Sequence, residues 1–433
     1  MKCTNPESSG KLDRQDWIQS EQERLFPCCE SFFRLPISLD EFIKIIDSPS
    51  FFASSVSNSS VQVNIKANGI HIDRTDDQML DEGISMQQSS RIPIAAFKKV
   101  QNVEKGLFSP DEERNQNSIL LGEVSKLVIR KLLCGTPSYD SKGFSLLSVE
   151  QMYQLCIATR DILKEESNIV YIDPPCRVFG DIRGHLKEIL GLFKTFGSPN
   201  HYTGDVELSK YVFNGNFIDC GKHSLDVICL LFSMKVLYPK QVYLIRGNHE
   251  DSSVNSTRGF RKECLNRINS EYGEPLWELF NHVFGFLPVG SIIGHKILCV
   301  HGGIGPSFTN IPQIQQIPKP IVNTWDNPMI REIIWAQTTS SDLALNTSVK
   351  QSEIKFDKEQ VIRFCIENGL ELLIRSNECV PCGYEFFSGG HLITIFSATN
   401  YLNNGNSGAC LTISPSLSVR AKSISPATLK SIQ

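Results

Sequence analysis

The chain has 433 residues and a formal net charge of −4, with 41% hydrophobic and 21% charged residues. This balance is typical of a globular protein, so it excludes wholesale disorder and gives no basic surface for nucleic acid. The longest apolar run, Val227–Phe232, is far shorter than the ~18 residues that a membrane span requires. We therefore expect neither a nucleic-acid partner nor a membrane-embedded segment.

The 14 cysteines are scattered through apolar and polar stretches without a repeating spacing. At this chain length they do not indicate the disulfide framework of a small secreted domain. Cys379 and Cys382 have CxxC spacing but no second pair follows, which favours an inert loop over a zinc or redox site. The polar start, Met1–Pro6, is unlike a signal peptide. We therefore expect reduced thiols in the cytoplasm, the nucleus or both.

Residues 1–114 contain long polar and Ser/Asn-rich stretches, which predict a partly disordered N-terminal extension. Within it, a capping-box pattern at Ser38–Glu41 predicts a helix that Pro49 ends, and alternation over 61–72 predicts a short strand. Residues 115–426 are predicted to form the compact domain, and 427–433 a short tail. The extension is interpreted either as a regulatory arm or as a small packed module.

The compact domain is predicted to begin with two helices and to continue with alternating strands and helices. Apolar spacing predicts a helix at Ile119–Leu133, and a capping box at Ser148 predicts another that runs to Lys164. Strands are then predicted at Cys176–Phe179, Tyr211–Phe213 and Val242–Ile245, with helices at Leu186–Phe196, at Ser224–Val236 and after Ser256. This βαβαβ order predicts a parallel sheet with right-handed crossovers.

Beyond Phe284 the pattern changes to short strands. They are predicted at Ser291–Ile293, Lys296–Val300, Leu372–Ile374, Tyr384–Phe387, Leu392–Phe396, Ala409–Ile413 and Leu417–Ala421. We expect these strands to form a second, more antiparallel sheet packed on the first. The predicted fold class is therefore α/β, arranged as a sandwich of two sheets with helices.

Glycine-containing polar segments follow several of these strands. They are Gly180–Gly184, Gly215–Gly221, Arg246–Glu250 and His301–Gly303. Ligand sites of open α/β sheets lie at the carboxyl ends of the strands, and glycines there permit tight turns and close backbone approach. Each segment alone is a weak signal, but their order along the chain predicts one site that gathers carboxylate, amide and imidazole groups.

These segments, together with Gly383–Phe387 and Ser397–Tyr401, resemble the phosphoprotein phosphatase family of serine/threonine phosphatases, and its type-1 branch in particular. The resemblance covers residues 115–426. It implies a calcineurin-like metallophosphoesterase fold, with two packed mixed β-sheets flanked by helices. It also implies two divalent metal ions (Mn, Fe or Zn) that hold an attacking hydroxide, a His–Asp pair that protonates the leaving oxygen, and arginines that hold the phosphate.

The implied site can be carried over residue by residue. The proton-donor pair is His249 and Asp219, and the retained metal-ligand types are Asp181, Asn248 and His301. Three ligand positions depart from the family pattern: Arg183 and Asn377 stand where it has histidines, and Asn216 stands where it has the bridging aspartate. The implied phosphate-binding residues are Arg246, Lys350 and Tyr401, while Cys220 replaces an arginine of the pattern.

These departures weaken the metal centre by charge and by ligand type. Neutral Asn216 supplies none of the negative charge that holds two dications close together. Arg183 brings a permanent positive charge to a metal's position, and Asn377 replaces an imidazole with a weak amide ligand. Asp181 is expected to pair with Arg183 instead. The neighbouring His185 begins a helix and is expected to point elsewhere. We therefore expect the metals to be absent or only partly bound.

Three functions follow from this pattern. The first is a pseudophosphatase that binds regulatory or phosphorylated proteins, and the second is an active phosphatase with a reorganised or single-metal site. The third is a metal-free phosphate binder that uses Arg183, Arg246 and Lys350. In the first case a docking groove for short hydrophobic motifs is implied at Ile297, Leu372, Phe386 and Leu417, next to the smaller Val419 and Ala421. Ordinary core packing is the alternative for these apolar residues.

The change in sequence character near Asn115 predicts that the N-terminal region is at least partly separable from the compact domain. Limited proteolysis of the full chain, read by mass spectrometry, should cut first between Asp76 and Asn117. First cuts within the βαβαβ region would contradict this domain boundary.

Overall fold

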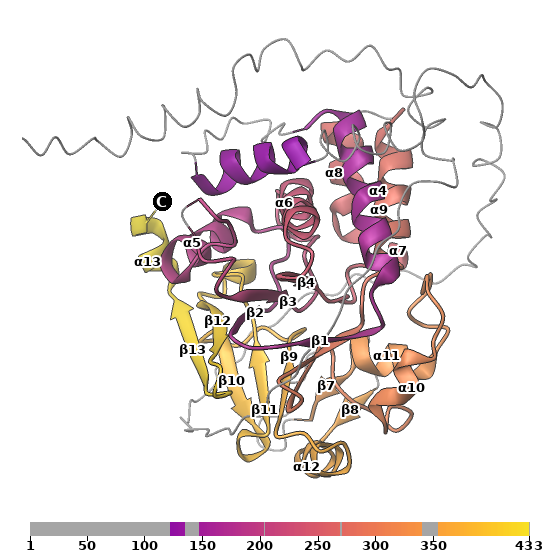
Figure 1. The fold of residues 1–433 in the computed structure, drawn as a ribbon, viewed down its shortest axis with the longest axis vertical. Helices are drawn as coiled ribbons and strands as arrows, with labels where there is room; N and C mark the ends of the chain where they lie inside the picture. Colours follow the sequence, from indigo (N-terminus) through magenta and orange to yellow (C-terminus); the bar gives the residue numbers. More distant parts are fainter. Residues whose placement is uncertain (1–121, 135–146, 203, 269–270, 340–353, 433) are drawn as a thin grey trace, which may run out of the picture. The chain divides into compact units, whose positions relative to one another are not determined.

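The computed structural model describes residues 122–134, 147–202, 204–268, 271–339 and 354–432 (Figure 1). The helix predicted from Ser38, the strand predicted over 61–72 and the phosphate-binding candidate Lys350 lie outside the described residues. The predicted helix near Ile119 is present, since residues 122–134 are helical and end in the π-helical turn η2 (Arg130–Cys134). Within the described segments, no helix combines the length and apolarity needed to cross a membrane.

The first sheet confirms the predicted parallel βαβαβ unit. Its strands are β2 (Cys176–Phe179), β3 (Lys210–Phe213) and β4 (Val242–Leu244), joined by helices α5 (Leu186–Phe196) and α6 (Ser224–Leu237). Two further strands, β12 (Gly408–Ile413) and β13 (Val419–Ile424), extend it in the order β13-β12-β2-β3-β4. We predicted these two strands in the other sheet. That assignment was wrong because β12 pairs antiparallel with β2, from Cys410↔Phe179 to Ile413↔Cys176.

The second sheet is mixed rather than mainly antiparallel. Its order is β1 (Ile169–Ile172), β5 (Gly290–Ile293), β6 (Ile297–Val300), β9 (Leu372–Arg375), β11 (Leu392–Ile395) and β10 (Tyr384–Phe387). Only β5–β6 and β10–β11 pair antiparallel, while β1–β5, β6–β9 and β9–β11 are parallel. The edge strand β1 was not predicted from the sequence. A small separate pair joins β7 (Gln337–Thr338) to β8 (Lys355–Phe356).

Alternating apolar side chains of the two main sheets build the interior. One face of the second sheet contributes Ile293, Ile297 and Ile395 to a buried cluster that also contains Val178 and Leu411 of the first sheet. The other face packs on helices α10 (Ile311–Gln315), α11 (Pro328–Trp335) and α12 (Lys358–Glu367) through a second cluster. Successive side chains of a strand point to opposite faces of the sheet, so each strand of the second sheet can contribute to both apolar clusters.

Helices cover the remaining face of the first sheet. They include α5, which packs against β12, and α6, which packs against β4. Grouped with α6 in the upper part of Figure 1 are α4 (Val149–Glu165), α7 (Ser252–Arg258), α8 (Phe260–Arg267) and α9 (Gly273–Phe284). The predicted capping box of α4 is present, because the Ser148 hydroxyl accepts from the Gln151 N–H while the Gln151 side chain accepts from the Ser148 N–H. The residues predicted as a tail form α13 (Pro426–Ile432), where Leu429 packs against Gly191 of α5.

The loop after β2 is held between the two sheets. A Cβ on Gly180 would lie 2.1 Å from the Ile395 carbonyl oxygen of β11, so only glycine permits this approach. The Gly180 N–H donates to the Ser397 hydroxyl at 2.9 Å, and the backbones of Asp181 and Phe396 form an isolated parallel β-bridge. The first polar segment therefore lies where the strands of both sheets end.

Candidate functional site

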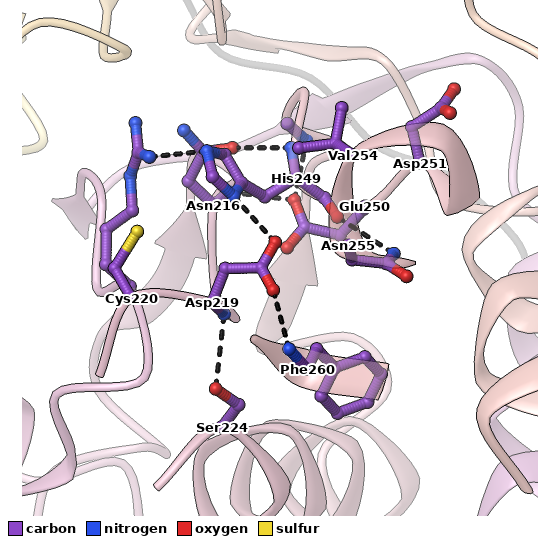
Figure 2. Close-up of polar contacts among 12 residues, drawn as sticks. Asn216, Asp219, Cys220, Ser224, His249, Glu250, Asp251, Val254, Asn255 and Phe260 are labelled. Carbon is purple, nitrogen blue, oxygen red and sulfur yellow. Dashed lines mark hydrogen bonds and ion pairs between the residues drawn. The ribbon is translucent and has the colours of Figure 1, made fainter. Parts of the chain in front are cut away.

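The polar segments gather at the carboxyl ends of β2, β3, β4, β6 and β9, as the strand order predicts. Figure 2 shows Asn216 and Asp219 both turned toward His249, with Glu250 nearby. The loops bend sharply at this site. Arg183, Asn216 and Asp219 adopt left-handed φ values of 53°, 54° and 71°. Asn and Asp tolerate this region, but for an arginine it costs about 1–2 kcal/mol, so the surroundings must hold Arg183 in place.

Asp181 is fully buried and its carboxylate is occupied by protein donors. The Arg183 Nε donates to its Oδ2 at 2.7 Å, and the Asn216 Nδ2 donates to the same oxygen at 2.8 Å. The Asn377 N–H donates to Oδ1 at 3.0 Å. The ion pair expected between Asp181 and Arg183 is therefore present, and a cation lies next to the carboxylate that the family pattern assigns to a metal.

Arg183 also reaches the proton-donor candidate. Its Nη1 contacts the His249 Nε2, and its guanidinium lies 5.6 Å from the centre of the Tyr401 ring. On the other side of the imidazole, His249 Nδ1 lies 2.7 Å from the Asp219 Oδ2, and Asp219 Oδ1 accepts from the Phe260 N–H at 2.8 Å (Figure 2). A guanidinium only donates, so its contact assigns Nε2 as an acceptor and Nδ1–H as a donor to Asp219.

Burial sets the protonation of this pair. It raises the pKa of the Asp219 carboxyl to about 6, while burial and the Arg183 guanidinium lower the pKa of His249 well below its usual value. His249 is therefore neutral near pH 7. General acid catalysis requires a proton on the group that faces the leaving oxygen, and Nε2 carries none in this arrangement. His249 Nδ1 contacts Asp219, but the other ring nitrogen, Nε2, is already occupied by the Arg183 guanidinium.

Glu250 is a buried organiser of the site that the sequence did not single out. Its carboxylate accepts the backbone N–H groups of Asn216, Phe217 and Gly247 at 2.8, 2.8 and 3.0 Å. Burial raises its pKa to about 7. It ties the loop after β3 to the loop after β4. The sequence feature that could have indicated Glu250 is its position at the end of the polar Arg246–Glu250 segment.

Asn248 Oδ1 and His301 Nε2 are among the buried side-chain acceptors that have no hydrogen-bond partner within the described residues. The His301 Nδ1 donates to the Asn214 carbonyl at 2.7 Å, which leaves Nε2 as an acceptor. Asn377, the third candidate in this half of the site, is partly buried. These groups are neutral. Within the described segments no three His, Cys, Asp or Glu residues are grouped so as to hold a metal. The side chains present do not fit a dinuclear centre.

The phosphate-binding candidates are only partly brought together. Arg246 is 1% exposed, and its guanidinium donates to the carbonyls of Glu250 and Ile321. Its phosphate binding stays a prediction that these internal contacts do not favour. Tyr401 lies beside Arg183, and its hydroxyl is 3.5 Å from the exposed Cys220 thiol. His185 begins α5, as predicted, with its Nδ1 3.5 Å from Glu188.

The predicted docking residues lie mostly in the core. Ile297, Leu372 and Leu417 are buried in the cluster between the two sheets. Phe386 on the edge strand β10 is partly buried against this cluster, as are Tyr384, Val419 and Ala421. The accessible apolar side chains of this region therefore belong to the edge strands β10 and β13, and groove function stays a prediction.

Comparison with known proteins agrees with this fold. Residues 175–381 match the family model described as calcineurin-like phosphoesterase. Over 284 residues the chain is 37% identical to serine/threonine-protein phosphatase BSL2 of Arabidopsis thaliana, an alignment that covers 65% of this chain and 28% of that protein. A solved Saccharomyces cerevisiae protein serine/threonine phosphatase, described as similar to human phosphatase PP5, superimposes with a TM-score of 0.56 at 24% identity, covering 64% of this chain and 90% of that one.

The matched segment is a calcineurin-like metallophosphoesterase domain. The match to the family model and the identity to the Arabidopsis phosphatase support a relation of this chain to the phosphoprotein phosphatase family. It spans 28% of the length of the Arabidopsis relative, and the likeness to the yeast structure shows the fold alone.

The buried contacts of Arg246 predict a structural role. Arg246→Met should lower the free energy of unfolding by about 3 kcal/mol, because it leaves buried carbonyls and the nearby Asp251 without their cation. Urea denaturation of the full chain measures this loss. The exposed Arg363→Met on α12 is the matched control and should change stability by less than about 0.5 kcal/mol. Equal stability of both variants would contradict the structural role.

Proposed function

We propose that this domain is a serine/threonine phosphatase-like module that binds regulatory or phosphorylated proteins and has lost most of its hydrolytic capacity. Asn216 is the observation that carries the proposal. At the position of the bridging carboxylate, its Nδ2 donates to Asp181 at 2.8 Å and its Oδ1 accepts the His249 N–H at 3.0 Å. Both ends of a neutral amide are therefore used within the protein, and neither supplies charge to hold two dications together.

The state of His249 supports the same proposal. Its Nε2 accepts from Arg183, and its pKa is depressed by burial and by that cation. A family member that hydrolyses phosphoserine needs a proton donor at the leaving oxygen. Here the imidazole is neutral and its outer nitrogen is occupied by Arg183, so the acid that protonates the leaving oxygen is missing.

The proposed binding surface lies at the open side of the sandwich. Tyr384 and Phe386 on edge strand β10, with Val419 on edge strand β13, are partly buried apolar side chains next to the inter-sheet core. An edge strand has unpaired backbone groups, and an extended peptide can add to it while its side chains enter adjacent apolar sites. The proposed partners are therefore proteins with a short extended hydrophobic motif.

An active enzyme with a single metal is the second candidate. It is supported by Asn248 Oδ1 and His301 Nε2, buried acceptors that no hydrogen-bond donor of the described part of the chain reaches, and by the contact of His249 with Asp219. Metal content and turnover distinguish the two candidates.

We predict that the purified full chain carries less than one equivalent of manganese, iron or zinc. The reason is the neutral amides at ligand positions and the guanidinium beside Asp181. Elemental analysis by mass spectrometry measures the content directly. Close to two tightly bound metals per chain would refute the impaired centre.

We also predict that restoring the departed ligands together restores metal binding and turnover. The variant combines Arg183→His, Asn216→Asp and Asn377→His. Asn216→Asp alone should do little because Arg183 still repels the first metal, and Arg183→His alone lacks the bridging charge. The gains in metal content and in phosphopeptide hydrolysis should therefore be non-additive.

The same triple variant with His249→Asn is the matched control, because it should bind metal yet lose turnover. A wild-type rate of about 1 per second or more on phosphoserine peptides would contradict the proposal. If the triple variant binds two metals but stays inactive, Cys220→Arg tests whether the missing phosphate contact limits the reaction.

A further inference from the structure

We infer that Arg183 is a tethered cation that organises the loops of this site, so that the folded domain does not depend on divalent metal for its stability. This inference concerns the fold and is independent of whether the domain binds protein partners. It follows from the failure of the site residues to fit a dinuclear centre, and from what occupies the corresponding place.

The Asp181–Arg183 ion pair contacts the loops that follow several strands. Arg183 follows β2, and its Nε donates to the buried Asp181 at 2.7 Å. Through Asp181 the pair reaches the Asn216 side chain after β3 at 2.8 Å and the Asn377 N–H after β9 at 3.0 Å. Through Nη1 it reaches His249 after β4. The Asp181–Arg183 ion pair thus joins loops from both sheets: the guanidinium links the loops after β2 and β4, and the carboxylate adds the loops after β3 and β9. A bound metal ion joins loops through its ligands in the same way.

The charge of Arg183 neutralises the buried carboxylate of Asp181. Asp181 is fully buried, and an ionised carboxylate in the interior is costly unless it is paired and hydrogen-bonded. Arg183 is 8% exposed and forms an ion pair with it, and the other donors to Asp181 are neutral amides. The cation is covalently attached and stays protonated, so it does not dissociate and chelators cannot remove it.

The backbone of Arg183 has a left-handed conformation that its surroundings maintain. Arg183 has a φ of 53°, which is unfavourable for a long side chain. Its backbone is held by bonds from the Arg183 and Gly184 N–H groups to the Asn216 and Phe217 carbonyls, at 2.8 Å each, and the Tyr401 ring lies over its guanidinium. The surrounding structure maintains a strained residue at the centre of the site, which fits a structural role for its side chain.

The decisive experiment compares melting temperatures of the unaltered full chain with excess EDTA and with about 1 mM Mn²⁺. A ligand that binds only the folded state raises its melting temperature. We expect the two values to agree within about 1 °C, since no metal contributes to the fold. A fall of several degrees in EDTA would overturn the inference, whatever the outcome of the activity assays.

Variants then test whether Arg183 itself is the organiser. Arg183→Gln should lower the melting temperature by on the order of 5 °C, because it strands the Asp181 carboxylate. Arg363→Gln, at an exposed position of α12, is the matched control and should change it by less than about 1 °C. Equal melting temperatures for the two variants would overturn the inference.

A double substitution separates the ion pair from other effects of residue 183. Asp181→Asn with Arg183→Gln removes both charges, so it should lose clearly less stability than the sum of the single losses. Strict additivity would show that Arg183 does not act through Asp181 and would overturn the inference. The EDTA comparison uses the unaltered chain, and it decides the case even if a variant does not fold.

Discussion

The ion pair between Asp181 and Arg183 is the interaction on which the rest of the site depends. A buried carboxylate at the end of β2 has to be neutralised, and in this chain a neighbouring side chain does so at 2.7 Å. The consequences spread from there. The guanidinium also contacts His249, the imidazole turns its N–H to Asp219, and Asn216 completes the ring of contacts to Asp181. The contacts of the site thus follow from how this one carboxylate is neutralised.

The charges of these side chains, rather than their positions, decide how the site is interpreted. Asn216, Asn248 and His301 still lie at the ends of their strands, because backbone turns and strand order place them there regardless of chemistry. What changes is the number of negative charges available to cations and the protonation of the acid. Fold likeness alone therefore says little about hydrolysis, and the electrostatics of particular side chains carry the functional argument.

Much of the fold could be predicted from local sequence patterns. The β2–β3–β4 unit follows from apolar runs of strand and helix length that alternate along the chain. The gathering of Asp181, Asn216 and His301 follows from their places directly after strands. The placement of β12 could not be predicted, because its partner is chosen by long-range packing rather than by its own pattern. Glu250 was missed because a lone carboxylate in a loop has no periodic signal. Ile297 and Leu417 show that an apolar residue predicts burial in a core as readily as in a groove.

The pairing of β12 with β2 has a consequence for how the chain folds. Cys176 near the start of the domain pairs with Ile413 near its end, so this contact closes a very long loop and raises the contact order. During synthesis from the ribosome, one edge of β2 stays without a strand partner until β12 has emerged, and such edges are prone to aggregation. Completion of the first sheet is therefore expected to be a late event, for which chaperones are needed more than for the local βαβαβ unit.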